Sequence, residues 1–254
     1  MSSAAHFDLT GRTAIVTGAN TGIGQGIAVA LAAAGAGIVA DGRSAMDETQ
    51  ALCSSHGRSF LAVKADLGTT EPIGRIVAAA QEIGARPDIL VNNAGIIRRS
   101  DAIDFSEEDW DAVLDVNLKA AFFLSQAAAR LMLADGVGGK IINIASLLSF
   151  QGGIRVASYT ASKSGLAGLT RLLACEWAGR GVNVNAIAPG YFVSNNTQAL
   201  REDSLRSADI LGRIPAGRWG EPSDLGGAAV FLASRASDYV DGITLPVDGG
   251  WLAR

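Results

Sequence analysis

An α/β fold built on a parallel sheet is the fold class that the sequence predicts, and three observations support it. Short apolar runs typical of buried strands alternate with longer stretches of helical periodicity along the chain. The first apolar run leads directly into a Gly-rich turn and a helix. No linker, internal repeat or low-complexity segment breaks the alternation. Residues 1–254 are therefore expected to form one doubly wound, Rossmann-type domain with a seven-stranded parallel sheet and helices on both faces.

Strands and helices are expected in alternation. Apolar runs predict strands at residues 12–17, 37–41, 59–65, 88–91, 139–145, 182–188 and 244–248. Helical patterns lie between them, at residues 25–34, 46–56, 70–84, from 106 onward, at 158–178 and at 222–234. The segment 191–215 has weaker periodicity and mixed charge, so it is expected to be a mobile lid with one or two short helices.

Composition restricts the class of function. Hydrophobic residues make up 48% and charged residues 18% of the 254 residues, as in globular proteins. A net charge of −4 without any basic run argues against nucleic acid as a partner. No apolar run reaches the ~18 residues needed to cross a bilayer, and the N-terminus carries no secretion signal. A cytoplasmic protein without membrane contact is expected.

Histidine and cysteine are scarce. His6 lies in a tail and His56 at a helix end, so neither a Ser-His-Asp hydrolase nor a metal site is expected. Cys53 and Cys175 lie far apart within predicted helices. Small buried residues in a reducing cytosol are the expected interpretation of both.

The Gly-rich turn has the spacing G-x-x-x-G-x-G. Glycine lets the backbone approach a pyrophosphate closely, and a helix N-terminus presents free N–H groups and a positive dipole end. A structural tight turn is the alternative, but the strand–turn–helix context favours a dinucleotide. The residues expected to contact it are Gly18, Asn20, Thr21, Gly22, Ile23 and Gly24.

The end of the second strand bears on the choice between NAD and NADP. Asp41 is suited to accept a hydrogen bond from a ribose 2′-hydroxyl, which favours NAD. Arg43 is suited to pair with a 2′-phosphate, which favours NADP. Each residue is otherwise a solvated surface charge. NAD or NADP is therefore expected as the cofactor, with a lean towards NAD.

More candidate ligand contacts follow the ends of other predicted strands, where ligands bind in a doubly wound sheet. Asp66 is placed to accept from an adenine amino group, or else to cap a helix. Small residues after the fourth strand suit close approach of the backbone to a ligand. The cofactor residues expected from these ends are Asp66, Leu67, Asn93, Ala94, Gly95, Pro189, Gly190, Phe192 and Ser194.

Tyr159 and Lys163 lie four residues apart in a predicted helix and so share one face. A free tyrosine titrates near pH ~10 and a neighbouring cation favours its phenolate, so the pair suits acid–base chemistry on an alcohol or ketone. Packing plus a solvated charge is the alternative. Ser146, at the end of the fifth strand, is placed to bind the same substrate oxygen. Asn117 interrupts a helical pattern, where an amide either faces solvent or opens the helix and holds a water.

Together these motifs resemble the short-chain dehydrogenase/reductase family over the whole chain. The motifs, in order, are T-G-x-x-x-G-I-G from Thr17, N-N-A-G from Asn92, Asn117, Ser146, Y-x-x-x-K from Tyr159, and Pro189-Gly190. The resemblance implies a homotetramer that transfers a hydride between the nicotinamide and a carbinol carbon. It implies that Tyr159 is the acid–base group and that Ser146 binds the reacting oxygen. It also implies that Lys163 lowers the tyrosine pKa and holds the nicotinamide ribose, and that Asn117 helps a water reach Lys163.

Several segments resemble, more narrowly, the branch of this family that acts on sugar acids, either 2-dehydro-3-deoxy-D-gluconate at C5 or 2-deoxy-D-gluconate at C3. These segments are residues 97–99, 149–155, 195–197, 213–220 and 249–254. Guanidinium suits a carboxylate, and amides suit hydroxyl groups. For the arginines, pairing with acids or lining a subunit interface is the alternative. The substrate residues expected besides Ser146 and Tyr159 are Arg99, Gln151, Arg155, Asn195 and Asn196.

Two other functions stay open. One is a reductase of the same family that acts on another small polar ketone or on a 3-oxoacyl substrate, although the polar substrate segments argue against an apolar ligand. The other is a non-catalytic protein that senses NAD(P)H. The presence of Tyr159, Lys163 and Ser146 argues against the second function.

Overall fold

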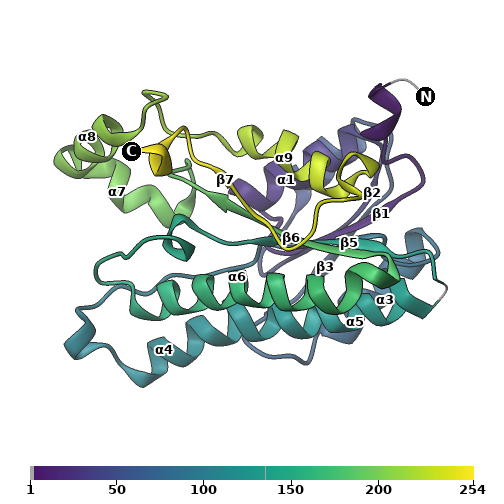
Figure 1. Ribbon diagram of the computed structural model, residues 1–254, viewed down its shortest axis with the longest axis horizontal. Helices are drawn as coiled ribbons and strands as arrows, with labels where there is room; N and C mark the ends of the chain where they lie inside the picture. The colour runs from purple at the N-terminus through teal and green to yellow at the C-terminus, as the bar shows by residue number, and fades with distance from the viewer. Residues whose placement is uncertain (1–2, 135) are drawn as a thin grey trace.

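The computed structural model describes residues 3–134 and 136–254, and a seven-stranded sheet forms its centre (Figure 1). The strand order is β3-β2-β1-β4-β5-β6-β7, with every pair parallel. The strands are β1 (Thr13–Val16), β2 (Gly37–Gly42), β3 (Phe60–Lys64), β4 (Ile89–Asn92), β5 (Gly139–Ile144), β6 (Val182–Pro189) and β7 (Thr244–Val247). The predicted Rossmann-type fold is confirmed. The order reverses between β1 and β4, which is where such sheets bind ligands.

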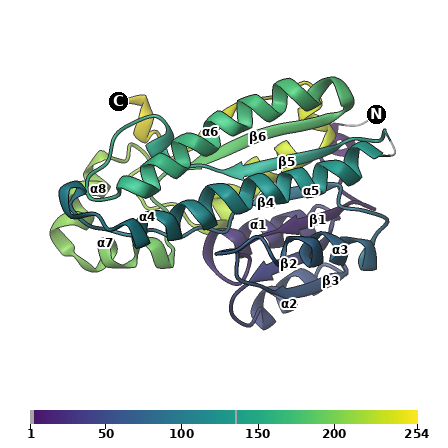
Figure 2. The ribbon, with the colours of Figure 1, turned by 90° about the horizontal axis from the view of Figure 1, so that it is seen from below.

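Helices cover both faces of the sheet (Figures 1 and 2). Helices α1 and α9 pack on one face, whereas α3, α5 and α6 pack on the other. None of the described helices is long and apolar enough to cross a membrane. The helices are α1 (Gly22–Ala33), α2 (Asp47–Ser54), α3 (Ile73–Ile83), α4 (Glu107–Leu114), α5 (Ala120–Ala134), α6 (Ala157–Trp177), α7 (Gln198–Glu202), α8 (Ser204–Arg213) and α9 (Gly226–Ala233).

Strand β1 shows why most strand residues are apolar. Ala14 and Val16 are buried in the core beside α1 and α9, whereas Ile15 is buried in the core beside α3 and α5. Successive side chains of a strand point to opposite faces, so a strand covered on both sides has no polar face. Polar residues inside the strands are buried and hydrogen-bonded: Asn143 of β5 donates to the hydroxyl of Thr170 at 2.9 Å, and Asn185 of β6 donates to the carbonyl oxygen of Val240 at 2.7 Å.

Local chemistry sets the bounds of the helix that carries Asn117. The hydroxyl of Ser106 caps α4 by accepting a hydrogen bond from the backbone N–H of Asp109 at 3.2 Å. A π-helical turn, η3 (Asp115–Lys119), then separates α4 from α5 and contains Asn117. Of the two alternatives left open for Asn117, the structure shows the second, because the residue is 1% exposed and lies in a π-helical turn.

The segment after β6 contains the two short helices α7 and α8, preceded by the 3-10 turn η6 (Asn195–Thr197), where one or two short helices were expected. An aromatic cluster of Tyr191, Trp219 and Trp251 packs against this segment. The ring centroid of Tyr191 lies 5.6 Å from that of Trp219 and 4.7 Å from that of Trp251. The guanidinium of Arg213, at the end of α8, stacks 4.0 Å above the Trp251 ring. The C-terminal residues thereby hold one side of the segment.

The two cysteines differ from each other. Cys53 in α2 is buried, as expected, and burial raises the pKa of its thiol to about 11. Cys175 in α6 is exposed, contrary to the expectation that both thiols are buried. Helical periodicity places both residues in helices but does not settle which side of α6 meets the core.

Candidate active site

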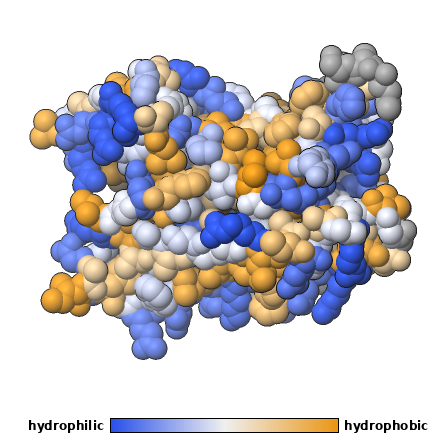
Figure 3. Space-filling view, in the orientation of Figure 1, coloured by the Kyte–Doolittle hydropathy of each residue, from blue (hydrophilic) through white to orange (hydrophobic). Residues whose placement is uncertain are grey.

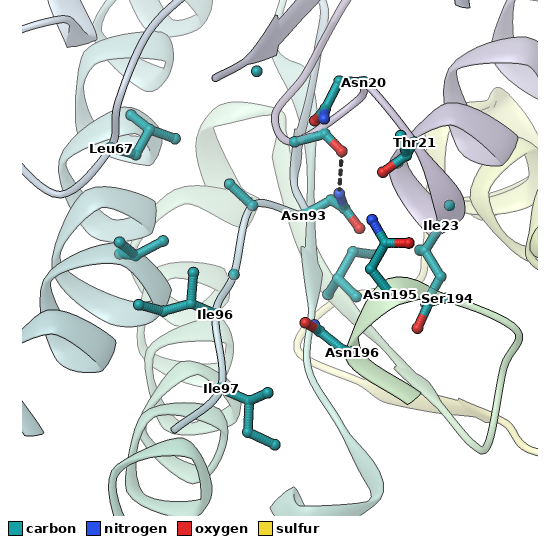
Figure 4. A pocket seen from close by; sticks show the side chains of 18 of the residues that line it. Asn20, Thr21, Ile23, Leu67, Asn93, Ile96, Ile97, Ser194, Asn195 and Asn196 are labelled. Atoms are coloured by element: carbon teal, nitrogen blue, oxygen red, sulfur yellow. Dashed lines mark hydrogen bonds between the residues drawn. The ribbon is translucent and has the colours of Figure 1, made fainter. Parts of the chain in front are cut away.

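A cavity of about 770 Å³ opens at the carboxyl ends of the strands (Figure 4). Its walls come from the β1–α1 turn, from the residues after β2, β3, β4, β5 and β6, and from the segment that leads into α7. Every residue predicted to contact the cofactor lines this cavity. Those residues are Gly18, Asn20, Thr21, Gly22, Ile23, Gly24, Asp41, Arg43, Asp66, Leu67, Asn93, Ala94, Gly95, Tyr159, Lys163, Pro189, Gly190, Phe192 and Ser194.

Sequence reasoning did not single out ten other lining residues. Most of them flank predicted residues, so the strand-end rule would have found them if applied to longer segments. Ile96 and Ile97, for example, continue the loop after β4 (Figure 4). The ten residues are Gly42, Ser44, Ala65, Ile96, Ile97, Arg98, Val116, Ile144, Ala145 and Thr197.

The Gly-rich turn fits a pyrophosphate group. Gly18 and Gly22 have φ angles of +62° and +57°, which favour glycine, and a Cβ on Gly24 would lie only 2.2 Å from the carbonyl oxygen of Gly18. The side-chain amide of Asn93 donates to the carbonyl oxygens of Thr17 at 2.8 Å and Gly18 at 3.1 Å, which fixes the turn (Figure 4). No side chain caps the N-terminus of α1. Its first N–H groups therefore face the cavity without a side-chain partner, as an anion site requires.

Asp41 and Arg43 occupy very different surroundings. Only 1% of Asp41 is exposed, and burial raises the pKa of its carboxyl group to about 7. A hydrogen bond from the Gly18 amide and the charge of Arg75 lower that pKa, and Asp66 raises it further. Arg43 is exposed and forms no ion pair with the other described residues. Asp41 is thus not the ordinary ionised carboxylate on which the lean towards NAD was based.

Tyr159 lies partly buried in the cavity wall on the first turn of α6. Burial raises the pKa of Tyr159, whereas a hydrogen bond with Ser146 and the charge of Arg99 lower it. The expectation that a neighbouring lysine favours the phenolate omitted burial, which disfavours the charged form and here outweighs the other effects. Burial thus favours the protonated phenol of Tyr159, which can donate a proton to a ligand, whereas only its phenolate form can accept one.

Lys163 is 4% exposed, and burial lowers the pKa of its ammonium to about 8. Its Nζ donates to the carbonyl oxygen of Ile144 at 2.6 Å and lies 5.6 Å from the centre of the Tyr159 ring. The i, i+4 spacing thus brings the two side chains together, as predicted. Lys163 also lines the cavity, where its remaining N–H groups face a ligand.

The loop after β5 holds Ser146 in place. The hydroxyl of Ser146 accepts from the backbone N–H of Leu148 at 3.2 Å. Two further serines tie this loop to α6, because Ser149 donates to the carbonyl oxygen of Lys163 at 2.8 Å and Ser164 donates to that of Leu148 at 3.1 Å. The serine and tyrosine hydroxyl groups are therefore positioned by one connected set of hydrogen bonds.

Asn117 is 1% exposed and does not line the cavity itself. Its Oδ1 accepts from the backbone N–H of Ile96 at 2.8 Å, and its Nδ2 donates to the carbonyl oxygen of Ile96 at 2.9 Å. Nδ2 also lies 3.2 Å from the hydroxyl of Ser162 on α6. The amide thus joins the loop after β4 to the tyrosine helix.

The predicted substrate residues separate into two groups. Asn195 and Asn196 line the cavity, and Figure 4 shows Asn195 beside Thr21 and Ile23 of the Gly-rich turn. Arg99 does not line the cavity but contacts a residue that does, because its Nη2 donates to the carbonyl oxygen of Asn196 at 3.0 Å. The charge of Arg99 also acts to lower the pKa of Tyr159.

Arg155 and Gln151 do not line the cavity, although both were expected to contact the substrate. Arg155 is exposed, has a φ of +63° and forms an ion pair with Asp101 at 3.2 Å. Gln151 accepts a hydrogen bond from the indole N–H of Trp251 at 3.2 Å. For Arg155 the structure thus shows the alternative of pairing with an acid. In the described part of the chain, no group of three or more His, Cys, Asp or Glu residues could hold a metal ion.

Comparisons with known proteins agree with this geometry. A family model described as enoyl-(acyl carrier protein) reductase matches residues 18–252. The chain is 60% identical over 248 residues to the 2-dehydro-3-deoxy-D-gluconate 5-dehydrogenase of Escherichia coli K12, with 98% of each protein covered.

Solved structures are similar over the same length. A protein of Agrobacterium tumefaciens that was crystallised with bound NADP is 60% identical to this chain, and the two structures superpose with a TM-score of 0.93. The match covers 98% of this chain and 99% of that chain. A gluconate 5-dehydrogenase of Burkholderia cenocepacia in complex with NADP and tartrate is 40% identical, with a TM-score of 0.92 and all of both chains covered. Matched in sequence and fold over nearly its whole length, the chain belongs to the short-chain dehydrogenase/reductase family, NAD(P)-dependent oxidoreductases that act on CH–OH groups.

Proposed function

We propose that the protein is a dehydrogenase of a sugar acid and that it oxidises 2-dehydro-3-deoxy-D-gluconate at C5. Oxidation of 2-deoxy-D-gluconate at C3 is the alternative. The observation that carries the proposal is that Tyr159 and Ser146 line the same cavity as the residues that fit a dinucleotide, with the charge of Arg99 acting on Tyr159 from beside it. The names of the similar enzymes support the choice of sugar acid.

In the proposed mechanism Tyr159 is the acid–base group and Ser146 orients the substrate. The serine hydroxyl would hydrogen-bond the reacting oxygen. Reduction would use the phenol form of Tyr159, whose Oη–H donates a proton to that oxygen, and oxidation would use the phenolate form, whose Oη accepts the proton of the substrate hydroxyl. When bound, the dinucleotide supplies or accepts the hydride at its nicotinamide. Lys163 would hold the nicotinamide ribose through its N–H groups. Because its ammonium already carries three hydrogens, it would pass on the tyrosine proton only by releasing one of its own to a water.

Asn117 is proposed as a positioning residue in this proton transfer. Its side chain is engaged by Ile96 and Ser162, so it does not itself exchange protons with the substrate. The π-helical turn around it opens the regular backbone hydrogen bonding of α4 and α5. A water held at that opening would connect Lys163 to solvent.

We propose Arg99 as the partner of the substrate carboxylate. A carboxylate that loses its water on entering the cavity needs a cation or several donors. Arg99 lies close enough to Tyr159 for its charge to lower the tyrosine pKa, and its guanidinium retains donors beyond the one given to Asn196. Arg155 already pairs with Asp101 outside the cavity.

Arg99→Ala tests this assignment, with Arg155→Ala as the matched control. Loss of a charge-assisted pair costs about 2–5 kcal/mol, so kcat/KM for the sugar acid is expected to fall by roughly 30-fold or more in the Arg99 variant. The kcat/KM for the corresponding neutral lactone should fall much less. The Arg155 variant should keep its preference for the acid. Equal preference for acid over lactone in wild type and the Arg99 variant would show that Arg99 is structural.

For the cofactor we propose that Arg43 binds a 2′-phosphate, so that the protein uses NADP(H). Arg43 lines the cavity, is exposed and is free of an ion pair among the described residues. Two similar structures contain NADP. The earlier lean towards NAD is a prediction that neither the structure nor these relatives support, because Asp41 is buried.

Arg43→Ala is expected to weaken NADP+ binding by about tenfold or more, since a charge-assisted phosphate contact contributes about 1.5–3 kcal/mol. Binding of NAD+, which lacks that phosphate, should change little. Both dissociation constants are measurable by calorimetry. An equal loss for NAD+ and NADP+ would mean that Arg43 does not read the phosphate.

We further propose a single domain with a lid at residues 191–215 and assembly of four copies in the cytoplasm. Exposed apolar side chains on the helices of one face support assembly: Trp110 on α4, Phe123 on α5 and Leu172 on α6. Figure 3 shows hydrophobic residues in the lower half of the molecule, where these helices lie in Figure 1. Light scattering of the purified protein measures the number of copies.

A further inference from the structure

Trp251, near the C-terminus, joins two parts of the candidate active site that are far apart in the chain. Its side chain is 3% exposed and does not line the cofactor cavity, and no step of the mechanism uses it. The indole N–H donates to Oε1 of Gln151 at 3.2 Å, in the loop after β5 that also carries Ser146. On its other side, Cζ of Arg213 at the end of α8 lies 4.0 Å from the centre of the indole ring. Trp251 therefore contacts both the Ser146 loop and the lid segment, residues 191–215.

Trp251 also belongs to a hydrophobic cluster that is separate from the two cores beside the sheet. Leu147, which follows Ser146 directly, lies in this cluster together with Ile210 and Ile214. Ile210 is in α8 and Ile214 comes directly after it, so the cluster packs the Ser146 loop against the lid segment. Burial of these apolar side chains stabilises the contact between the two segments, independently of the cores that stabilise the sheet.

The turn before Trp251 fixes the position of the indole. The carboxylate of Asp248 accepts from the backbone N–H groups of Gly250 at 2.8 Å and of Leu252 at 2.9 Å. Gly250 has a φ of +89°, which favours glycine, and a Cβ on it would lie 3.0 Å from Cγ of Pro215. The backbone of the turn thus approaches the end of the lid segment closely, and the indole extends from a turn whose geometry is defined by its own hydrogen bonds.

Both contacts of the indole lead to groups that line the cavity. The backbone N–H of Gln151 donates to the carbonyl oxygen of Leu147 at 3.1 Å, so Gln151 and Ser146 belong to one tight turn, and Ser146 lines the cavity. In the lid segment, the residues of η6 line the cavity and lead directly into α7, whose Leu200 packs against the hydrophobic cluster. A shift of the indole would therefore move two opposite walls of the cavity relative to each other.

We propose that Trp251 is a positioning residue, which holds the Ser146 loop and the lid segment in the arrangement that binds the sugar acid. Gln151, which the sequence predicts to contact the substrate, acts on it through the indole. The inference rests on the proposed function in that the substrate lies between Ser146 and the lid segment. The Gly-rich turn and the ends of β2 and β3 lie outside the hydrophobic cluster, so dinucleotide binding does not depend on Trp251.

Gln151→Met removes the acceptor of the indole N–H and keeps a side chain of similar length. Loss of one hydrogen bond changes an equilibrium by about threefold to tenfold, so KM for the sugar acid is expected to rise by that factor. The dissociation constant of NADP+ should not change, and kcat should change less than KM, because Tyr159 and Lys163 lie outside the cluster. Gln81→Met, at an exposed position of α3, is the matched control and should leave KM unchanged.

The split between KM and the number of active sites distinguishes positioning from a general loss of stability. A less stable protein loses active sites, which titration with dinucleotide counts, but each remaining site keeps its KM. Trp251→Phe removes the same indole N–H, so it is also expected to raise KM, and Gln151→Met should add little in that background. Effects on KM that multiply in the double variant would show that Gln151 acts without the indole and would overturn the proposal, as would an unchanged KM in both single variants.

Hydrogen exchange of the backbone amides tests the coupling without any substrate. Gln151→Met, in the Ser146 loop, is expected to speed exchange in α8 by about threefold to tenfold, and Arg213→Ala, in α8, should likewise speed exchange at residues 147–151. Exchange in α1 should stay unchanged in both variants. Faster exchange only in the segment that carries the substitution would overturn the proposal. If wild type turned over neither sugar acid, the proposed substrate would be wrong, yet reciprocal effects on exchange would still show that Trp251 holds the two segments together.

Discussion

Tyr159→Phe is expected to lower kcat by about 10²–10⁴-fold, the range that a positioned acid–base group contributes. The ring keeps its packing in the cavity wall, so the fold and the dissociation constant of the dinucleotide should stay within about twofold of wild type. The hydroxyl that hydrogen-bonds with Ser146 is the single group removed. Stopped assays of kcat together with calorimetric binding of NADP+ measure both effects.

Tyr191→Phe is the matched control for this variant. Tyr191 is also partly buried, but its ring belongs to the aromatic cluster with Trp219 and Trp251. Its hydroxyl has no proposed role in proton transfer, so kcat should change little. A kcat near that of wild type for Tyr159→Phe would refute the assignment of the acid–base group.

Lys163→Met is expected to lower kcat and also to weaken dinucleotide binding, because one ammonium group serves both the tyrosine and the ribose. We expect a loss of about 10²-fold or more in kcat and about tenfold in affinity, the latter equal to ~1.4 kcal/mol. Methionine fills a similar volume in the buried site but leaves the carbonyl oxygen of Ile144 without its donor at 2.6 Å. That loss alone costs stability of about 1–3 kcal/mol, which thermal unfolding would detect.

Lys119→Met provides the control for loss of a lysine. Lys119 is an exposed residue of the π-helical turn and pairs with Asp115 at 2.9 Å, so its removal should affect neither kcat nor affinity. A Lys163 variant that loses turnover while its dinucleotide dissociation constant stays unchanged would contradict the dual role. In that case Lys163 acts on the tyrosine alone.

Much of the cofactor cavity could be predicted from the sequence because the parallel sheet collects its strand ends at one edge. Gly18, Asp66, Asn93 and Pro189 are far apart in the chain, but each follows or ends a strand and all four line one cavity. The rule requires only that the strands be recognised and that they be parallel. The mostly apolar runs identify the strands, and their alternation with helices indicates that the strands are parallel.

Side-chain partners could not be predicted in the same way. Gln151 is paired with Trp251, 100 residues further along the chain, and no local pattern reveals that contact. The pairing of Arg155 with Asp101 depends likewise on how two loops after different strands meet. Placing a residue near a strand end thus predicts the neighbourhood but not the direction of its side chain.

Ionisation states were the least predictable feature, because they depend on burial. The i, i+4 spacing of Tyr159 and Lys163 predicts their proximity, yet burial raises the pKa of the tyrosine and lowers that of the lysine to about 8. The sequence predicts that Asp41 either accepts a hydrogen bond from a ribose or is a solvated charge. In the structure Asp41 is buried near the end of β2, a strand that is covered on both faces. The local sequence does not show how deeply an ionisable side chain is buried once the helices pack against the sheet.

The specificity of wild-type protein is the measurement that tests the central claim most directly. Initial rates with NADP+ and NAD+ should be compared for 2-dehydro-3-deoxy-D-gluconate, 2-deoxy-D-gluconate, a neutral lactone and, in the reverse direction, a 3-oxoacyl thioester. We expect kcat/KM for one of the two sugar acids to exceed that of the lactone and the thioester by about 30-fold or more, as a paired carboxylate requires. A thioester or lactone that is turned over as efficiently as either acid would contradict the proposed function.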